Sequence, residues 1–248
     1  MDFIEQLILF GISLLANTFS SFSGGGAGLI QFPALIFLGL SFSVALATHK
    51  IASVALGVGA ALRYLKSSPL ERYFVLLILG AGVPGVIIGA RLILFVPDRI
   101  AMVALGVLTG GLGIYSILKP DLGQDYQSKH RDCRGYIIGG VVLFFLGILN
   151  GSLTSGTGLF VTLWFGMDYQ RAIAYTLILV GLFWNGSGAV TLGLYGAIRW
   201  DWLPALLLGS LLGGYWGTHL AIKHGNRWIK RAFELVTLLI SAKLLLGN

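Results

Sequence analysis

The chain has 248 residues, of which 56% are hydrophobic and only 11% are charged. Soluble domains carry about 25% charged residues, so this sequence lacks the polar residues that would cover a water-facing surface. Its apolar content equally excludes a disordered chain. The net charge of +7 is spread over short polar gaps between apolar runs, which is typical of membrane proteins rather than of a nucleic-acid-binding face. The single cysteine, Cys133, excludes an internal disulfide and a multi-cysteine metal site, and we expect no cofactor.

About ten apolar segments follow one another along the chain, and a membrane-spanning helix needs about 20 apolar residues. The segments cover residues 4–22, 29–38, 42–62, 73–96 and 100–118, then 136–149, 159–167, 172–195, 200–222 and 232–246. Whether the two short segments, 29–38 and 159–167, span fully or re-enter is left open. The sequence predicts an all-α, polytopic integral membrane protein with eight to ten spans.

The second half of the chain repeats the first. Gly26-Ala27-Gly28-Leu29 aligns with Gly156-Thr157-Gly158-Leu159, and Gly85 and Gly89 align with Gly213 and Gly217. These pairs have similar offsets, so we predict a tandem duplication. The expected organisation is a first transmembrane repeat at residues 1–118, a cytoplasmic polar linker at 119–135 and a second transmembrane repeat at 136–248.

The basic gaps between segments predict the orientation, because cytoplasmic loops of membrane proteins are enriched in Lys and Arg. Arg63, Lys66 and Arg72 precede the fourth segment, and further basic residues lie in the linker and between residues 223 and 231. Five crossings per repeat place all three gaps on the cytoplasmic side and give the repeats opposite topology. Four crossings plus a re-entrant hairpin would make the repeats parallel, so we favour five plus five, inverted.

Each repeat contains one glycine-rich helix break with polar residues beside it. Broken segments at matching positions of inverted repeats point to a transporter binding site, and freed backbone N–H groups in the membrane need partners. Neither break carries a carboxylate, so a small anion is the expected ligand; the alternative is that the glycines only permit close helix packing. The candidate residues are Gly24, Gly25, Gly26, Gly28 and Gln31 at the first break, and Asn150, Ser152, Thr154, Gly156, Thr157 and Gly158 at the second.

Lys50 is the sharpest single candidate. It lies about 12 Å along a predicted helix that starts at residue 42, where a charge is costly unless it faces a cavity or a partner. The alternative is a lysine that extends to the membrane interface. The Asp and Glu residues of the first repeat lie at the ends of the apolar runs or in the gaps between them, Glu5 among them, so the counter-charge of Lys50 is expected to be the substrate. A buried carboxylate of the kind that often couples transport to cations is missing as well, which leaves the coupling mode open.

Two stretches of the sequence resemble the sulfite exporter TauE/SafE family of membrane permeases. The first runs from Gly24 to Pro33 and continues at Ala47-Thr48-His49-Lys50; the second runs from Asn150 to Gly158 and continues at Arg171-Ala172 and Thr176. The resemblance covers essentially the whole chain. It implies transport of a small sulfur anion, such as sulfite, thiosulfate or sulfoacetate, across a bacterial inner membrane.

The resemblance also implies site residues. Thr48 and Lys50 match the Thr-x-Lys of the family's first half, but Leu177 follows Thr176 where a second lysine is usual. Thr154-Ser155 likewise replaces the family's Gly-Pro. A cationic centre in this chain is therefore expected to be asymmetric, with Lys50 as its charged residue.

We therefore expect an inner-membrane permease that moves a small anion by alternating access. Lys50 would supply charge, Thr48, Asn150 and Thr157 hydrogen bonds, and residues 24–28 backbone donors. The expected partners are the anion and the lipid bilayer, without nucleic acid, and a homo-oligomer stays open. The alternatives are a passive anion channel on the same scaffold and a non-transporting assembly subunit; an enzyme is disfavoured because HExxH, GxSxG and CxxC motifs are missing.

Overall fold

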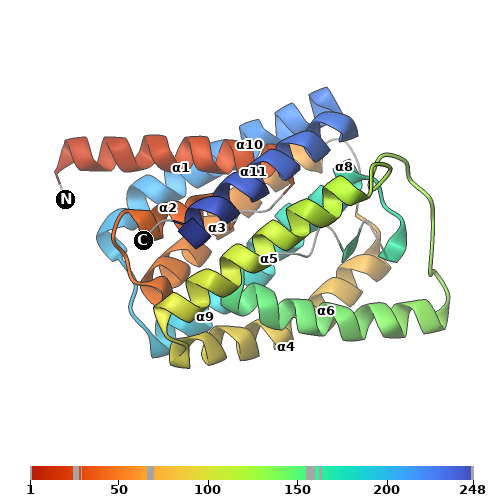
Figure 1. Cartoon of the computed structure of the whole chain (residues 1–248), viewed down its shortest axis with the longest axis horizontal. Helices are drawn as coiled ribbons and strands as arrows, with labels where there is room; N and C mark the ends of the chain where they lie inside the picture. The colour runs from red at the N-terminus through yellow and green to blue at the C-terminus, as the bar shows by residue number, and fades with distance from the viewer. Residues whose placement is uncertain are drawn as a thin grey trace.

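The structure is a computed structural model of the chain and describes residues 2–24, 28, 30–65, 70–154, 160–161 and 164–246. The described part is helical, without strands. In the first half, its helices are α1 (Phe3–Ser23), α2 (Gln31–Phe37), α3 (Phe42–Tyr64), α4 (Arg72–Leu92) with a 3-10 turn η1 (Ile93–Phe95), and α5 (Asp98–Leu118). The expected all-α fold is confirmed (Figure 1).

The second half is also built of long helices joined by short elements. They are α6 (Cys133–Leu153), α8 (Tyr169–Tyr175), the π-helix η2 (Thr176–Trp184), α9 (Asn185–Tyr195), a 3-10 turn η3 (Trp200–Trp202), α10 (Leu203–His224) and α11 (Asn226–Leu246). Because α8, η2 and α9 follow without a gap, residues 169–195 form one continuous helical rod.

Seven helical stretches within the described residues are long and apolar enough to cross a membrane. Helix α11 has 21 residues but is not among them, because Arg227, Lys230, Arg231 and Glu234 charge its first half. Helix α2, with seven residues, is about 10 Å long and does not span by itself. Large apolar side chains are exposed along the outer faces of the long helices, as contact with lipid requires.

The chain nevertheless crosses the bundle between α1 and α3. Gly24 lies beside Ile173 of α8 and Ile229 of α11, at the end of the bundle where the central linker lies. The amide of Phe42, the first residue of α3, donates to Asp98 Oδ2 (2.9 Å) at the opposite end, where α1 begins and α11 ends. We call these the linker end and the terminal end. The chain thus passes from the linker end at Gly24 to the terminal end at Phe42, and α2 lies between these two residues.

The two halves run in opposite directions. In Figure 1, α1 and α5 run from left to right, whereas α6 and α11, their counterparts in the repeat, run from right to left. The packing also relates the two halves. Helix α1 lies against α10, and their counterparts α6 and α4 lie against each other in the same way. Helices α5 and α11, which are counterparts of one another, also lie side by side. The innermost pair, α3 and the rod 169–195, are also counterparts and contact each other. A two-fold relation between inverted repeats requires this pattern.

Glycines set the closest helix contacts. A Cβ at Gly85 of α4 would overlap the Phe144 carbonyl of α6, and a Cβ at Gly213 of α10 would overlap the Leu14 carbonyl of α1. Gly85 and Gly213 are the pair that the sequence repeat aligns, so both halves use the same device. Small residues at helix crossings let backbones approach, which is how membrane helices gain packing energy.

Replacing Gly85 with alanine is expected to lower the free energy of unfolding by about 1–3 kcal/mol, because the added methyl separates α4 from α6. Gly80→Ala is the matched control on the same helix, since a Cβ there would have no atom within 4 Å. Thermal unfolding in detergent measures both. Equal melting temperatures for the two variants would contradict the packing described here.

Candidate functional site

The two glycine-rich breaks meet inside the bundle. A Cβ at Gly28 would overlap the side chain of Thr154, so the first break lies directly against the end of α6. Helix α6 continues to Leu153, three residues further than the start of the small polar stretch at Asn150. The break in the second half therefore begins at Thr154.

Thr154 itself is strained. Its φ of 60° lies in the left-handed region, which is rare for a β-branched residue. Its side chain is buried, and its Oγ1 has no hydrogen-bond partner among the described residues. Such strain clusters at functional sites, where the surrounding structure maintains it.

Lys50 lies beside this meeting point and is completely buried. Its Nζ donates to the Asn150 carbonyl oxygen (3.0 Å) and to Asn185 Oδ1 (3.1 Å), with Asn150 Oδ1 at 3.5 Å. The lysine of α3 thereby joins α6 and α9. It does not extend to the membrane interface, so the alternative weighed for Lys50 does not describe this structure.

The charge of Lys50 has no counter-charge. All ten Asp and Glu residues belong to the described part of the chain, and the four ion pairs found there do not include Lys50. Its three acceptors are neutral amide oxygens. A lysine at the centre of a membrane helix costs about 2.5–3.5 kcal/mol on insertion scales, and neutral acceptors offset the lost hydration without cancelling the charge.

A second set of buried polar groups extends from the neighbouring residue, His49. His49 Nδ1 lies 2.9 Å from Gln31 Oε1, and Gln31 Nε2 donates to Ser13 Oγ (2.8 Å) and Ser210 Oγ (3.0 Å). Ser53 Oγ closes the other side of the ring at 3.0 Å from Nε2. The network ties α2 to α1, α3 and α10.

The π-helix supplies the residue that the sequence analysis missed. Helices with i→i+5 hydrogen bonds are rare and concentrate at functional sites; η2 has nine residues and ends at Trp184, directly before Asn185. The wider turns of the π-helix change the direction in which the side chains after it point, and the side chain of Asn185 faces Lys50. The available signal was a lone Asn in a long apolar run, next to Gly186-Ser187-Gly188.

The structure brings together only part of the predicted site. Lys50, Asn150, Thr154 and Gly28 are linked by direct contacts. Gln31 instead bonds to Ser13, His49 and Ser210, and Gly24 lies further towards the linker end, against Ile173. Two predicted residues are engaged elsewhere: Thr48 Oγ1 accepts from the Arg199 amide (3.0 Å), and Ser152 Oγ donates to the Ile148 carbonyl of its own helix (2.8 Å). Gly25, Gly26, Gly156, Thr157 and Gly158 lie outside the described residues.

The counterpart of Lys50 in the second half is apolar, as the sequence indicates. Leu177 is buried in a cluster with Leu56, Ile173 and Ile229. The described part of the chain contains no group of three His, Cys, Asp or Glu side chains placed to bind a metal ion.

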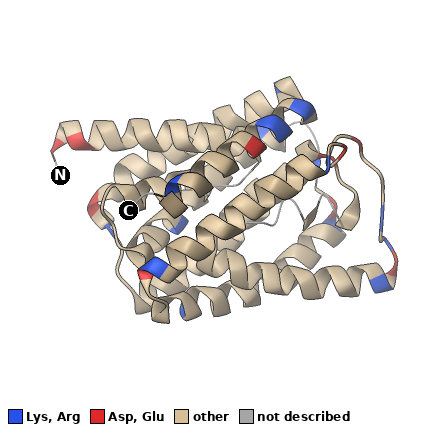
Figure 2. Cartoon of the chain, viewed as in Figure 1, with Lys and Arg blue, Asp and Glu red and all other residues tan. Residues whose placement is uncertain are grey.

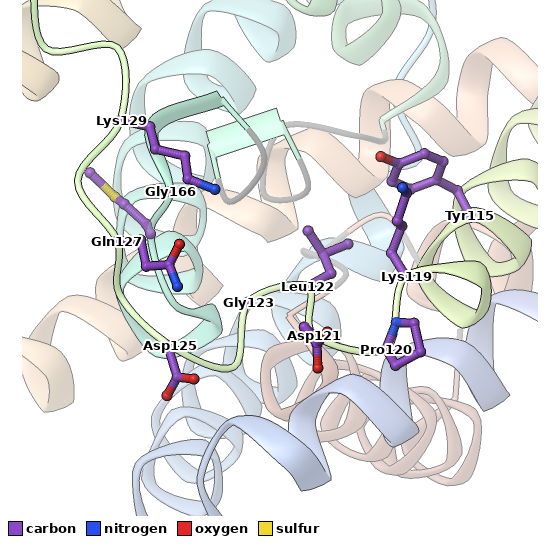
Figure 3. Close-up of a pocket in the computed structure, with 11 residues that line it drawn as sticks. Tyr115, Lys119, Pro120, Asp121, Leu122, Gly123, Asp125, Gln127, Lys129 and Gly166 are labelled. Atoms are coloured by element: carbon purple, nitrogen blue, oxygen red, sulfur yellow. The ribbon is translucent and has the colours of Figure 1, made fainter.

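The central linker packs on the segment that follows the second break. The Gln127 amide donates to the Gly166 carbonyl (2.8 Å) and the Tyr169 amide to the Gly123 carbonyl (2.8 Å). Between them lies an open cavity of about 350 Å³, with Lys119 and Lys129 on opposite sides (Figure 3). The linker therefore fixes the start of the rod 169–195 at the linker end.

Fold and site together define a class: a multi-pass helical membrane protein whose broken helices meet at a buried, uncompensated cation. The model of the sulfite exporter TauE/SafE family matches residues 9–244. The chain belongs to this family and is a membrane transporter.

Curated relatives carry matching descriptions. "Probable membrane transporter protein YfcA" of Escherichia coli K12 is 29% identical over 96% of this chain and 88% of its own length. A "Probable membrane transporter protein" of Haemophilus influenzae is 28% identical over 96% of this chain and 93% of its own. No solved structure matches the chain.

The position of Lys50 is testable through Gly188. A Cβ on Gly188 would lie 2.7 Å from Lys50 Cδ, so Gly188→Ala is expected to lower the free energy of unfolding by about 1–3 kcal/mol. In a Lys50→Ala background the nearest remaining atom is Val86 Cγ1 at 3.3 Å, so Gly188→Ala is expected to cost less stability there than in the wild type. Thermal unfolding measures this cycle, with Gly186→Ala as the control, since its Cβ would meet only Val54 at 3.9 Å. Additive effects of the two substitutions would contradict the contact.

Proposed function

We propose that this chain is a bacterial inner-membrane permease that moves a small sulfur oxyanion or organosulfonate, of the sulfite, thiosulfate or sulfoacetate class, by alternating access. The observation that carries the proposal is Lys50: a fully buried ammonium group, without a carboxylate partner, where the two helix breaks meet. The family of sulfite exporters adds the sulfur chemistry of the substrate.

The chemistry of the site favours an anion with several oxygens. The Lys50 ammonium group has three N–H donors and no acceptor, and hydrogen bonds between charged groups are about twice as strong as neutral ones. An oxyanion that enters would replace the neutral oxygens of Asn150 and Asn185 and balance the charge. Thr154 Oγ1, which has no partner within the described part of the chain, is a further donor near the first break.

The hydrogen bonds of Lys50 couple anion binding to a conformational change. Lys50 belongs to the first half of the chain, and both of its partners, Asn150 and Asn185, belong to the second. An anion that bonds to Lys50 in place of Asn150 and Asn185 breaks the contacts of Lys50 with the second half. Because Lys50 has no exposed surface in this structure, it does not line an open aqueous pore, which supports a carrier over a channel.

Charge distribution supports the orientation. Figure 2 shows the charged residues near the ends of the helices. Those of the linker end include Arg63, Arg72, Lys119, Lys129, Arg131, Arg134, Lys223, Arg227, Lys230 and Arg231, whereas the terminal end has Arg91, Arg99, Arg199 and Lys243. By the positive-inside rule the linker end faces the cytoplasm.

Substituting Lys50 with methionine, which keeps length and removes charge, is expected to reduce anion flux by about tenfold or more, because hydrogen bonds to charged groups contribute about 1.5–3 kcal/mol. Uptake of labelled sulfite, thiosulfate and sulfoacetate into proteoliposomes measures this. Lys243→Met is the matched control, since Lys243 lies at the end of α11 over the ring of Phe37.

Saturable flux with counterflow in the wild type is the expected result, and single-channel currents would point to the channel instead. Flux that is equal in wild type and Lys50→Met would contradict the cationic site. No flux of any of these anions from folded protein would contradict the proposed substrates.

The substitution Asn185→Asp tests whether the charge of Lys50 must be free to bind the anion. A carboxylate 3.1 Å from Lys50 Nζ would form a permanent ion pair and compete with the substrate, so anion flux is expected to fall by about tenfold or more. Gln127→Glu, the same amide-to-carboxylate change at an exposed residue of the linker, is expected to leave flux within about twofold, because surface charges there are screened by water and salt. Wild-type flux in Asn185→Asp would show that the charge of Lys50 is not needed for transport.

A further inference from the structure

His49 is a titratable side chain that the anion site does not use. It is completely buried on α3, directly before Lys50. Consecutive residues of a helix point about 100° apart, and Lys50 Nζ bonds to amide oxygens of the second half. The His49 ring instead faces Gln31 and Ser53 of the first half. Because the ordinary charge change of histidine lies close to neutral pH, His49 is a candidate for carrying a proton.

The two partners of the ring accommodate both of its charge states. A protonated imidazole has two N–H donors, whereas a neutral one has one donor and one acceptor. Gln31 Oε1 lies 2.9 Å from Nδ1 and Ser53 Oγ lies 3.0 Å from Nε2, so each nitrogen of a protonated ring has an oxygen acceptor. The Ser53 hydroxyl reaches the His49 carbonyl oxygen at 2.9 Å and can turn its proton there or towards a neutral ring. Turning one hydroxyl group is enough to change between the two states.

Lys50 is the charged side chain, among the described residues, that acts on the His49 ring. From α2 the ring meets Gln31 and Phe32, and behind Gln31 lie Ser13 of α1 and Ser210 of α10. All four are neutral. The remaining charged and histidine residues of the helices around α2 and α3 lie near helix ends: Glu5 of α1, Arg63 of α3, Asp98 and Arg99 of α5, Arg171 of α8, and His219, Lys223 and His224 of α10.

Lys50 and His49 therefore respond to each other. Two unpaired positive charges on consecutive residues repel each other, and the low dielectric constant of a protein interior makes this repulsion strong. While Lys50 bonds to neutral amide oxygens, a second charge on His49 is costly. An anion bound to Lys50 balances its charge, which removes the repulsion and lets the ring take up a proton. The coupling is reciprocal, so a proton on His49 strengthens anion binding to the same degree.

A proton on His49 also acts on α2, the short helix between the two ends of the bundle. Gln31 is the first residue of α2, and its amide nitrogen donates to Ser13 of α1 and to Ser210 of α10. The amide of Gln31 is therefore shared between the His49 ring and the α1–α10 pair, whereas Lys50 contacts α6 and α9. The proton and the anion thus act on different contacts of the same helix, α3, as a coupled carrier requires.

We propose that His49 is a proton-binding site whose occupancy is controlled by the charge of Lys50, and that the chain carries its anion together with a proton. Each ligand lowers the cost of binding the other, so the two move in the same direction. That an anion balances the charge of Lys50 rests on the proposed function. The control of His49 by Lys50 does not, because it depends only on the two side chains.

Proton uptake on anion binding tests the joint transport. Purified protein in weakly buffered detergent solution is mixed with thiosulfate, which stays ionised between about pH 5.5 and 8, and an indicator dye reports the protons taken up. The wild type is expected to take up protons, and its thiosulfate affinity is expected to fall by up to about tenfold per pH unit as the pH rises, the limit for one linked proton. His49→Gln is expected to lose both effects. His224→Gln is the matched control, because His224 is exposed at the end of α10.

A second measurement needs no anion. NMR titration of the histidine ring signals compares the wild type with Lys50→Met, and the His49 signal is identified by its loss in His49→Gln. Without the ammonium group, the His49 ring is expected to take up its proton at a pH that is higher by about one unit or more. Lys243→Met, which removes a charge from the last turn of α11, is expected to leave the His49 titration unchanged.

Thiosulfate binding without proton uptake in the wild type would overturn the proposal, as would equal uptake in the wild type and His49→Gln. A His49 titration that is the same in the wild type and Lys50→Met would overturn it as well. Folded protein that binds no thiosulfate would contradict the proposed substrate and with it the joint transport, and the NMR comparison still decides the proton site.

Discussion

The uncompensated charge of Lys50 is the constraint on which the rest of this structure depends. A lysine without a counter-ion is costly at this depth in a membrane, and the chain satisfies it only with the neutral oxygens of Asn150 and Asn185. Asn150 lies in the last turn of α6, and Asn185 directly follows the π-helix within the rod 169–195. The breaks, the π-helix and the crossing of α3 are parts of one arrangement.

Glycine packing makes that arrangement possible. The two central rods cross where Gly57 and Gly181 meet, and a Cβ on either would overlap the other backbone or approach it closely. The outer pairs, α1 with α10 and α4 with α6, use aligned glycines in the same way. The glycine-rich composition therefore has two functions, close helix packing and interruption of helices, which the sequence analysis had treated as competing explanations.

Much of this follows from the sequence. Apolar segments, their duplication and the positions of the breaks predict the helices and their inverted path, because hydropathy and Lys/Arg bias have direct physical causes. Lys50 and Asn150 were predicted for the same reason: polar groups in apolar runs need partners. The residue limits assigned to the two repeats and the linker stay predictions.

Other features were not predictable by that reasoning. Thr48 and Lys50 are two residues apart, about 200° around a helix, so one site cannot take both side chains; Asn150 and Ser152 have the same relation. This geometry was accessible from sequence and explains why Thr48 binds the Arg199 amide instead. Asn185 stood out as a lone Asn in an apolar run, but the direction in which it faces was not accessible, because residues 177–184 show no sign of a π-helix. The docking of the linker on Gly166 depends on tertiary contacts.

The most direct measurement of the central claim is an experimental structure of the protein with bound thiosulfate, whose sulfur atoms identify the anion by their anomalous signal. The account predicts that the anion lies within hydrogen-bonding distance of Lys50 Nζ, between the two breaks, and that the bonds from Lys50 to Asn150 and Asn185 are released. An anion found away from Lys50, with those bonds intact, would contradict it.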